Sequence, residues 1–170
     1  MPIGICGSGL IDLLSEMLKA GIMDSSGRLI ERDHPRIRKI SGISEYVIAE
    51  KKETGLDEDI SITQKDIREL QKGKAAIFSG SQIAMNHLGL SPQSIEQIYI
   101  AGAFGTYINR ESAINIGMIP EFKLLDIQQV GNAAGTGARM ALLSRKSRLE
   151  AQRIRDKIDY IELATLPEYN

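Results

Sequence analysis

The chain has 170 residues, of which 42% are hydrophobic, so it can bury a core of the size found in one folded unit. Its 21 basic and 22 acidic residues nearly cancel, which argues against nucleic acid as a partner, and its single cysteine excludes an internal disulfide or a cysteine-ligated iron–sulfur cluster. No apolar run approaches the roughly 20 residues of a membrane helix, so we expect one unit in the cytoplasm without a membrane partner.

The first predicted element is a helix, and a set of short strands follows it. After the glycine-rich motif GICGSG at residues 4–9, Ser8 is placed to cap a helix over residues 9–20, where apolar residues recur at helical spacing. Three β-type runs then alternate with turn signals, which favours a small antiparallel sheet. The runs are residues 28–30, 45–49 and 60–63.

A long helix is predicted next, over residues 64–88. Thr63 and Asp66 resemble a capping box at its start, with Asp in place of the usual Glu or Gln. Gly73 and Gly80 interrupt the helical pattern, so we expect the helix to bend or divide there.

The second half of the sequence alternates strands with helices, which predicts an α/β fold. The predicted elements are a strand at 98–101, a helix at 110–117, a strand at 126–130, a helix that follows 131–138 and runs to about 158, and a last strand at 160–164. The apolar run at 98–101 is typical of a buried parallel strand, and we expect it to lie beside the strand at 126–130 in one sheet.

Two loops of the predicted sheet share one design. AGAFG at 101–105 and GNAAGTGA at 131–138 each follow an apolar strand and lead into a helix. Glycine lets a ligand approach the backbone, and free N–H groups at a helix start attract phosphate or ribose oxygens, so the loops could line one nucleotide pocket. The alternative is that the small residues only permit tight packing of helix on strand.

Other polar residues leave two interpretations open. Lys72 and Lys74 could reach a ribose or a phosphate, or could lie on a solvated helix face. Cys6 could have a lowered thiol pKa near a helix start, although we favour a packing role. His34 and His87 lack partners at ligand spacing, so we expect no metal site.

Six segments, taken in order, resemble one known family over nearly the whole chain. They are GICGSGLIDLL (4–14), ITQKDIRELQKGKAAI (62–77), IYIAGAFGTYI (98–108), IGMIP (116–120), VGNAAGTGA (130–138) and YIELA (160–164). The family is the reductive activators of corrinoid proteins, which are ferredoxin-containing, ATP-dependent metalloproteins. They belong to the acetate and sugar kinase, heat-shock chaperone and actin (ASKHA) superfamily.

The resemblance implies a fold and a function. The fold is an RNase H-like, actin-like ATPase lobe, a mixed sheet flanked by helices, and residues 1–170 would be the C-terminal part of this domain in a longer iron–sulfur protein. In full-length members a ferredoxin domain supplies electrons, and ATP with Mg drives reduction of Co(II) to Co(I) on a partner corrinoid protein. The iron–sulfur cluster and the remaining half of the ATPase domain would lie outside this chain, which we expect to be inactive alone.

The resemblance also implies cofactor-binding residues but no catalytic residue. AGAFG would be the adenosine loop, GNAAGTGA would border the pocket, and Lys74 would lie on a helix facing the ribose and adenine. The expected residues are Lys74, Gly102, Ala103, Phe104, Gly105, Asn109, Gly131 and Asn132.

Two other functions fit the same residues. One is a lobe of a sugar or acyl-phosphate kinase of the same superfamily, and the other is a non-catalytic docking module. Activators of this family can form homodimers, and the sequence does not fix the oligomeric state.

Overall fold

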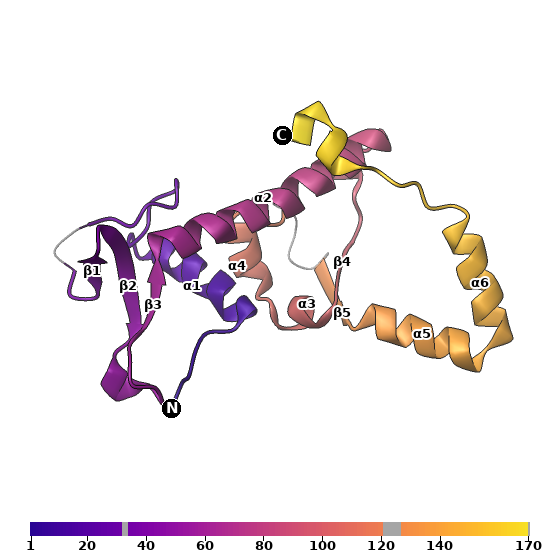
Figure 1. Ribbon diagram of the computed structural model, residues 1–170. Coiled ribbons are helices and arrows are strands. Elements are labelled where there is room, and N and C mark those ends of the chain that lie inside the picture. The colour runs from indigo at the N-terminus through magenta and orange to yellow at the C-terminus, as the bar shows by residue number, and fades with distance from the viewer. Residues whose placement is uncertain (32–33, 121–126, 170) are drawn as a thin grey trace. The chain divides into compact units, whose positions relative to one another are not determined.

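The computed structural model describes residues 1–31, 34–120 and 127–169 (Figure 1). The chain falls into two compact units instead of the single one expected. Unit 1 comprises Met1–Phe78 and Ile108–Phe122, and unit 2 comprises Ser79–Tyr107 and Lys123–Asn170. Each unit is a mixture of helices and strands, in agreement with the expected α/β class.

Unit 1 combines a three-stranded antiparallel sheet with helices. Its elements are α1 (Gly7–Lys19), β1 (Ile37–Ile40), β2 (Ile43–Ala49), a 3₁₀ helix (Lys51–Glu53), β3 (Ile60–Thr63), the first part of α2 (Gln64–His87) and α4 (Arg110–Asn115). Helix α1 contacts α4, and Ile11, Leu14 and Met17 on α1 are buried. The core of unit 1 is built mainly from Ile, Leu and Met.

The predicted antiparallel sheet is confirmed, but its first strand is not the expected one. β2 and β3 contain the predicted runs, while residues 28–30 make only an isolated bridge between Leu29 and Met23. β1 takes the edge position instead, and most of it is exposed, so no apolar pattern marks it. Ser8 lies inside α1 and does not cap it, because the helix begins at Gly7, two residues earlier than expected, and Cys6 is the N-cap.

Helix α2 begins at the predicted capping box and runs without a break. The backbone N–H of Thr63 donates to Asp66 Oδ2 at 2.9 Å, and that of Asp66 donates to Thr63 Oγ1 at 3.2 Å. The expected interruptions are wrong, because the helix continues through both glycines. Gly80 has a packing reason: a Cβ there would lie 3.2 Å from Leu163 Cδ1. Gly89, with φ of 65°, follows the helix end as predicted.

Unit 2 contains a parallel strand pair and the helices that follow each strand (Figure 1). Its elements are the end of α2, a 3₁₀ helix (Pro92–Ser94), β4 (Ile98–Ala101), α3 (Ala103–Tyr107), β5 (Ile127–Gly131), α5 (Ala133–Leu143), α6 (Arg145–Arg155) and two 3₁₀ helices (Leu163–Thr165 and Pro167–Tyr169). Ile98 pairs with Ile127, and the strands are parallel, as predicted. Asp126, expected to open the second strand, lies outside the described residues.

Two predicted elements of unit 2 are wrong. The single helix expected up to about residue 158 is divided at Ser144, whose extended backbone ends α5 and whose Oγ accepts from Ser147 N at 3.2 Å to cap α6. Residues 160–164 form no strand, since Leu163–Thr165 is a short 3₁₀ helix. Among the described residues, no helix has the combination of length and apolarity needed to cross a membrane.

Candidate functional site

The two glycine-rich loops of unit 2 lie together. β4 and β5 are hydrogen-bonded parallel neighbours, so the loops leave the same edge of the pair (Figure 1). The backbone N–H of Gly102, just beyond β4, donates at 2.7 Å to the carbonyl of Gly131, the last residue of β5. The predicted convergence of AGAFG and GNAAGTGA is therefore confirmed.

Gly102 and Gly131 are required by backbone conformation. Their φ values are 98° and 63°, in the region that favours glycine. A Cβ on Gly102 would have no heavy atom within 4 Å, and one on Gly131 would lie 3.9 Å from Thr106 Oγ1. The space beside both residues is thus open to a ligand. Thr106, which the sequence analysis did not single out, fixes the loop by donating from Oγ1 to the Gly102 carbonyl at 3.0 Å.

Gly105 has a different role from the two other glycines. A Cβ there would lie 2.4 Å from Ile100 Cγ2, so its hydrogen side chain lets α3 pack against β4. Gln129 Nε2 donates to the Gly105 carbonyl at 2.7 Å and ties the same turn to β5. The packing alternative therefore accounts for Gly105. Ala103 and Phe104 form the first turn of α3, and contact of any of these residues with a ligand stays a prediction.

Asn132 lies between β5, which ends at Gly131, and α5, which begins at Ala133, so residues 133–138 of the expected loop are helical. Its Oδ1 accepts from Gly135 N at 2.9 Å, which satisfies one free donor of the first turn. A Cβ on Gly135 would lie 2.7 Å from Asn132 Nδ2, so this glycine makes room for the cap. The cap places the positive end of the α5 dipole directly after the loop, which suits a ligand carrying negative oxygens.

Lys74 and Asn109 belong to unit 1, where each has a structural partner. Lys74 Nζ donates to the carbonyl of Ile116, just after the end of α4. Asn109 caps the other end of this helix, because its Oδ1 accepts from Ser112 N at 3.1 Å. Contact of either residue with a nucleotide therefore stays a prediction. Lys72 forms an exposed ion pair with Glu69 at 2.8 Å, as the solvated alternative predicts.

The GICGSG motif exposes its cysteine. Cys6 is exposed, so the packing role favoured from the sequence is wrong. Its Sγ lies 3.3 Å from Ser8 Oγ. This hydrogen bond, followed by one from the Gly9 backbone, lowers the pKa of the Cys6 thiol. The motif lies in unit 1, while the two loops that meet at β4 and β5 lie in unit 2.

Comparison with known proteins finds relatives along the whole chain. A family model described as "C-terminal domain of RACo the ASKHA domain" matches residues 1–170. The corrinoid activation enzyme RamQ of Eubacterium limosum is 36% identical over 177 residues, covering 99% of this chain and 30% of that protein. The [Co(II) methylated amine-specific corrinoid protein] reductase of Methanosarcina barkeri is 27% identical, covering 99% of this chain and 28% of that protein.

A solved structure also matches. A reductive activator for corrinoid, iron–sulfur protein superposes with a TM-score of 0.91 and 42% sequence identity, covering 99% of this chain and 27% of that one. The chain therefore spans less than a third of the length of these relatives. Their names favour the corrinoid activator over the kinase lobe and the docking module.

Proposed function

The chain belongs to the family of C-terminal ASKHA domains of RACo, and we propose that it is the nucleotide-binding portion of an ATP-dependent reductive activator of corrinoid proteins. The full-length protein would act in the cytoplasm and reduce an inactive Co(II) corrinoid, held by a partner protein, to Co(I). The observation that carries this proposal is the convergence of the β4 and β5 loops, joined by the 2.7 Å bond between Gly102 and Gly131.

In this proposal the loops of unit 2 hold the adenosine of ATP. Gly102 and Gly131 leave open space beside the backbone, and the start of α5 offers N–H groups to oxygens of the ribose or phosphates. Gly105 positions the first loop through its packing on Ile100. Lys74 Nζ uses one of its three hydrogens on the Ile116 carbonyl, and the ammonium keeps donors for other acceptors.

The remaining part of the full-length protein would complete the reaction. One electron converts Co(II) to Co(I), and we assign its supply to an iron–sulfur cluster outside this chain. The loops that bind Mg and the ATP phosphates would also lie outside it. Because those loops provide most of the charge complementarity to ATP, we expect the isolated chain to bind ATP weakly.

The substitution Asn132→Asp tests the nucleotide site. Aspartate caps helices as well as asparagine does, so α5 and the fold should persist. Its carboxylate would repel ATP, and we expect the affinity of the full-length protein for ATP to fall by about tenfold or more. Isothermal titration calorimetry measures this affinity. At limiting ATP, the rate at which the Co(I) absorbance spectrum appears on a corrinoid protein should fall together with the affinity for ATP.

Ser144→Asp is the matched control, because it places an aspartate at another helix N-cap of unit 2. It should leave ATP affinity unchanged. If Asn132→Asp binds ATP as tightly as the unmodified protein does, the β5 loop is not part of the nucleotide site. If ATP binds normally but does not affect corrinoid reduction, the nucleotide site stands and the reductive function fails.

A further inference from the structure

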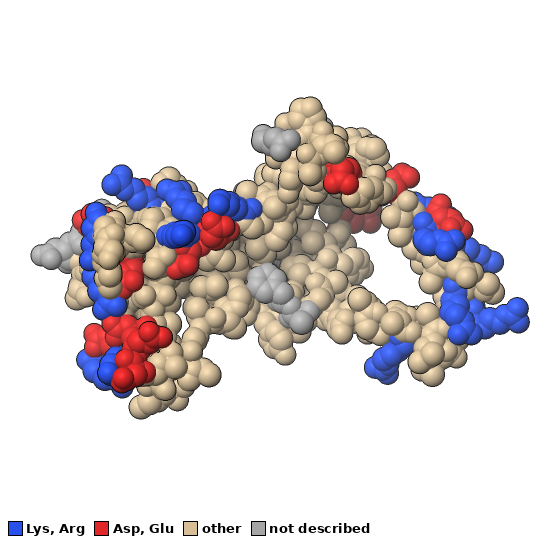
Figure 2. Space-filling model, in the orientation of Figure 1, with Lys and Arg blue, Asp and Glu red and all other residues tan. Residues whose placement is uncertain are grey.

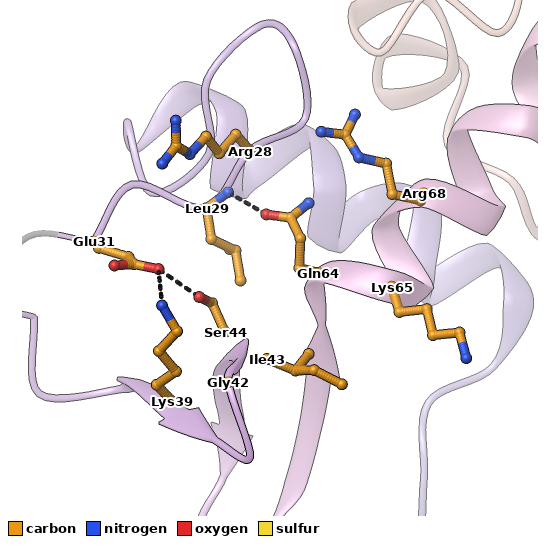
Figure 3. Close-up of a pocket in the computed structure, with 10 residues that line it drawn as sticks. All are labelled: Arg28, Leu29, Glu31, Lys39, Gly42, Ile43, Ser44, Gln64, Lys65 and Arg68. Carbon is orange, nitrogen blue, oxygen red and sulfur yellow. Dashed lines mark hydrogen bonds and ion pairs between the residues drawn. The ribbon is translucent and has the colours of Figure 1, made fainter.

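Unit 1 has a surface hollow that is separate from the loops of the proposed nucleotide site. Residues of the segment before β1, the β1–β2 hairpin and the first turns of α2 line it (Figure 3). Its volume of about 670 Å³ falls in the range, roughly 300–1,000 Å³, that small-molecule sites occupy. We call it the α2 hollow.

The α2 hollow is lined mainly by positive charge. Its charged lining residues are four bases, Arg28, Lys39, Lys65 and Arg68, and one acid, Glu31. Figure 2 shows Lys and Arg side chains, with Asp and Glu side chains among them, on the surface around the beginning of α2. This imbalance is local, because the whole chain has 21 basic and 22 acidic residues.

Glu31 neutralises one of these cations. Its Oε1 accepts from Ser44 Oγ at 2.6 Å and lies 3.5 Å from Lys39 Nζ (Figure 3). The hydrogen bond from Ser44, and then the charge of Lys39, lower the pKa of Glu31, so it stays ionised at neutral pH. Within residues 1–31, 34–120 and 127–169, neither Arg28 nor Lys65 has an ion-pair partner.

Arg68 is held in place without being neutralised. Its Nη1 donates to the Ser26 carbonyl at 2.9 Å and to Gln71 Oε1 at 2.8 Å, and both acceptors are uncharged. Within the described part of the chain, its Nε and Nη2 make no hydrogen bond. A guanidinium fixed in this way offers its remaining donors in a fork that matches carboxylate and phosphate oxygens.

The segment that carries Arg28 is clamped to the same helix. Gln64 Oε1 accepts from Leu29 N at 2.8 Å, and Gln64 Nε2 donates to the Gly27 carbonyl at 2.7 Å. The Leu29 side chain is only 2% exposed, so it anchors the segment in the core. Arg28 and Arg68 therefore come from two elements whose backbones are fixed to each other (Figure 3).

We propose that the α2 hollow binds a small organic anion carrying two or more phosphate or carboxylate groups. Within the described residues, Arg28, Lys65 and Arg68 form no ion pair. The carboxylates of Asp24 and Glu31 act on Arg28 from a distance. A multivalent anion between these cations would reduce their mutual repulsion. Arg38, elsewhere in unit 1, is by contrast neutralised, since it lies 2.6 Å from both Glu45 and Asp59.

The test is calorimetric titration of the 170-residue chain with pyrophosphate and, separately, with citrate. Sodium chloride holds the ionic strength constant. One of these anions should bind at a single site, and the stronger of the two identifies phosphate or carboxylate as the favoured group. The double substitution Arg28→Gln with Lys65→Gln removes two cations whose side chains make no hydrogen bond or ion pair with the described residues, and it should weaken binding at least tenfold.

The matched control is Arg145→Gln with Lys146→Gln, which makes the same change of charge on exposed α6. It should leave the affinity unchanged. Equal weakening by both double variants would show a response to net charge only and would overturn the proposal. The proposal would also be overturned if neither anion bound. Binding of a hexaglutamate peptide instead of the small anions would overturn it as well, because it would indicate a docking surface for an acidic polypeptide.

Discussion

Cys6 is a solvent-exposed thiol whose surroundings favour its charged form. Ser8 and the Gly9 backbone lower its pKa below the ordinary value. Between the lowered pKa and the ordinary value of about 8.5, Cys6 therefore carries more thiolate than a free cysteine does. Since the thiolate is the nucleophile, we expect alkylation by iodoacetamide to reach half of its maximal rate at a lower pH than in glutathione.

Ser8→Ala should move this pH profile upward, because it removes the largest contribution to the shift. Cys6 is the only cysteine of the chain, so the measured rate reports one site. Coinciding profiles for the unmodified chain and the variant would show that the hydrogen bond between Cys6 and Ser8 does not favour the thiolate in solution.

The sequence predicted that the glycine-rich loops matter as a whole, but it did not predict the role of each residue in them. The motif AGAFG marks a loop after a strand, but it does not distinguish Gly102, needed for its φ of 98°, from Gly105, needed for contact with Ile100. That distinction depends on how α3 turns back onto β4. Polar residues that fix the loops, Thr106 and Gln129, have no signature of their own in the sequence.

At the level of elements, Gly105 and Gly137 form a matched pair for a stability test. Gly105→Ala should destabilise the chain by about 1–3 kcal/mol, because the new Cβ would overlap Ile100 Cγ2, which is attached to a stiff branched carbon. Gly137→Ala should stabilise it by about 0.5–1 kcal/mol, since Gly137 lies inside α5 with no heavy atom within 4 Å of a Cβ.

Urea denaturation followed by circular dichroism measures both changes. A neutral or stabilising effect of Gly105→Ala would mean that α3 does not pack closely on β4 in solution, and it would restore ligand approach as the reason for this glycine. If Gly137→Ala lowered the stability of the chain, we would infer that another group packs against α5 at this position.

Elements with a strong local signal were predicted well. The apolar run of β4 and the capping box of Thr63 and Asp66 are local features, and both are confirmed. The division between α5 and α6 was missed because Ser144 is flanked by Leu143 and Arg145, which are good helix formers, and no Gly or Pro marks the break. β1 was missed because an exposed edge strand lacks the alternation that a buried face imposes.

At the scale of the whole molecule, the sequence predicted the α/β class but not the division into two units. The boundary between Phe78 and Ser79 falls inside continuous α2, so no linker marks it. The order of motifs nevertheless identified the family, because it depends on the succession of strands, loops and helices, which the tertiary arrangement does not alter.

The two units also differ in how much apolar surface they bury. Helix α1 buries Ile11, Leu14 and Met17, whereas no residue of α5 or α6 is buried within the described parts of the chain. Leu142 and Leu143 at the end of α5 are 74% and 82% exposed. Helices of this length are marginal in water unless an apolar face is packed, so α5 and α6 should open locally at low free-energy cost.

Hydrogen–deuterium exchange of the 170-residue chain measures this difference. Amides of α5 and α6 should exchange at least about tenfold faster than those of α1, which corresponds to about 1.4 kcal/mol less free energy of opening. The helices are of similar length, with 13 residues in α1 and 11 each in α5 and α6, so length does not account for the difference in exchange rate. Equal protection that disappears on dilution would mean that a second copy covers the apolar residues of α5. Equal protection at every concentration would mean that the chain itself covers them, and would contradict the exposed positions of Leu142 and Leu143.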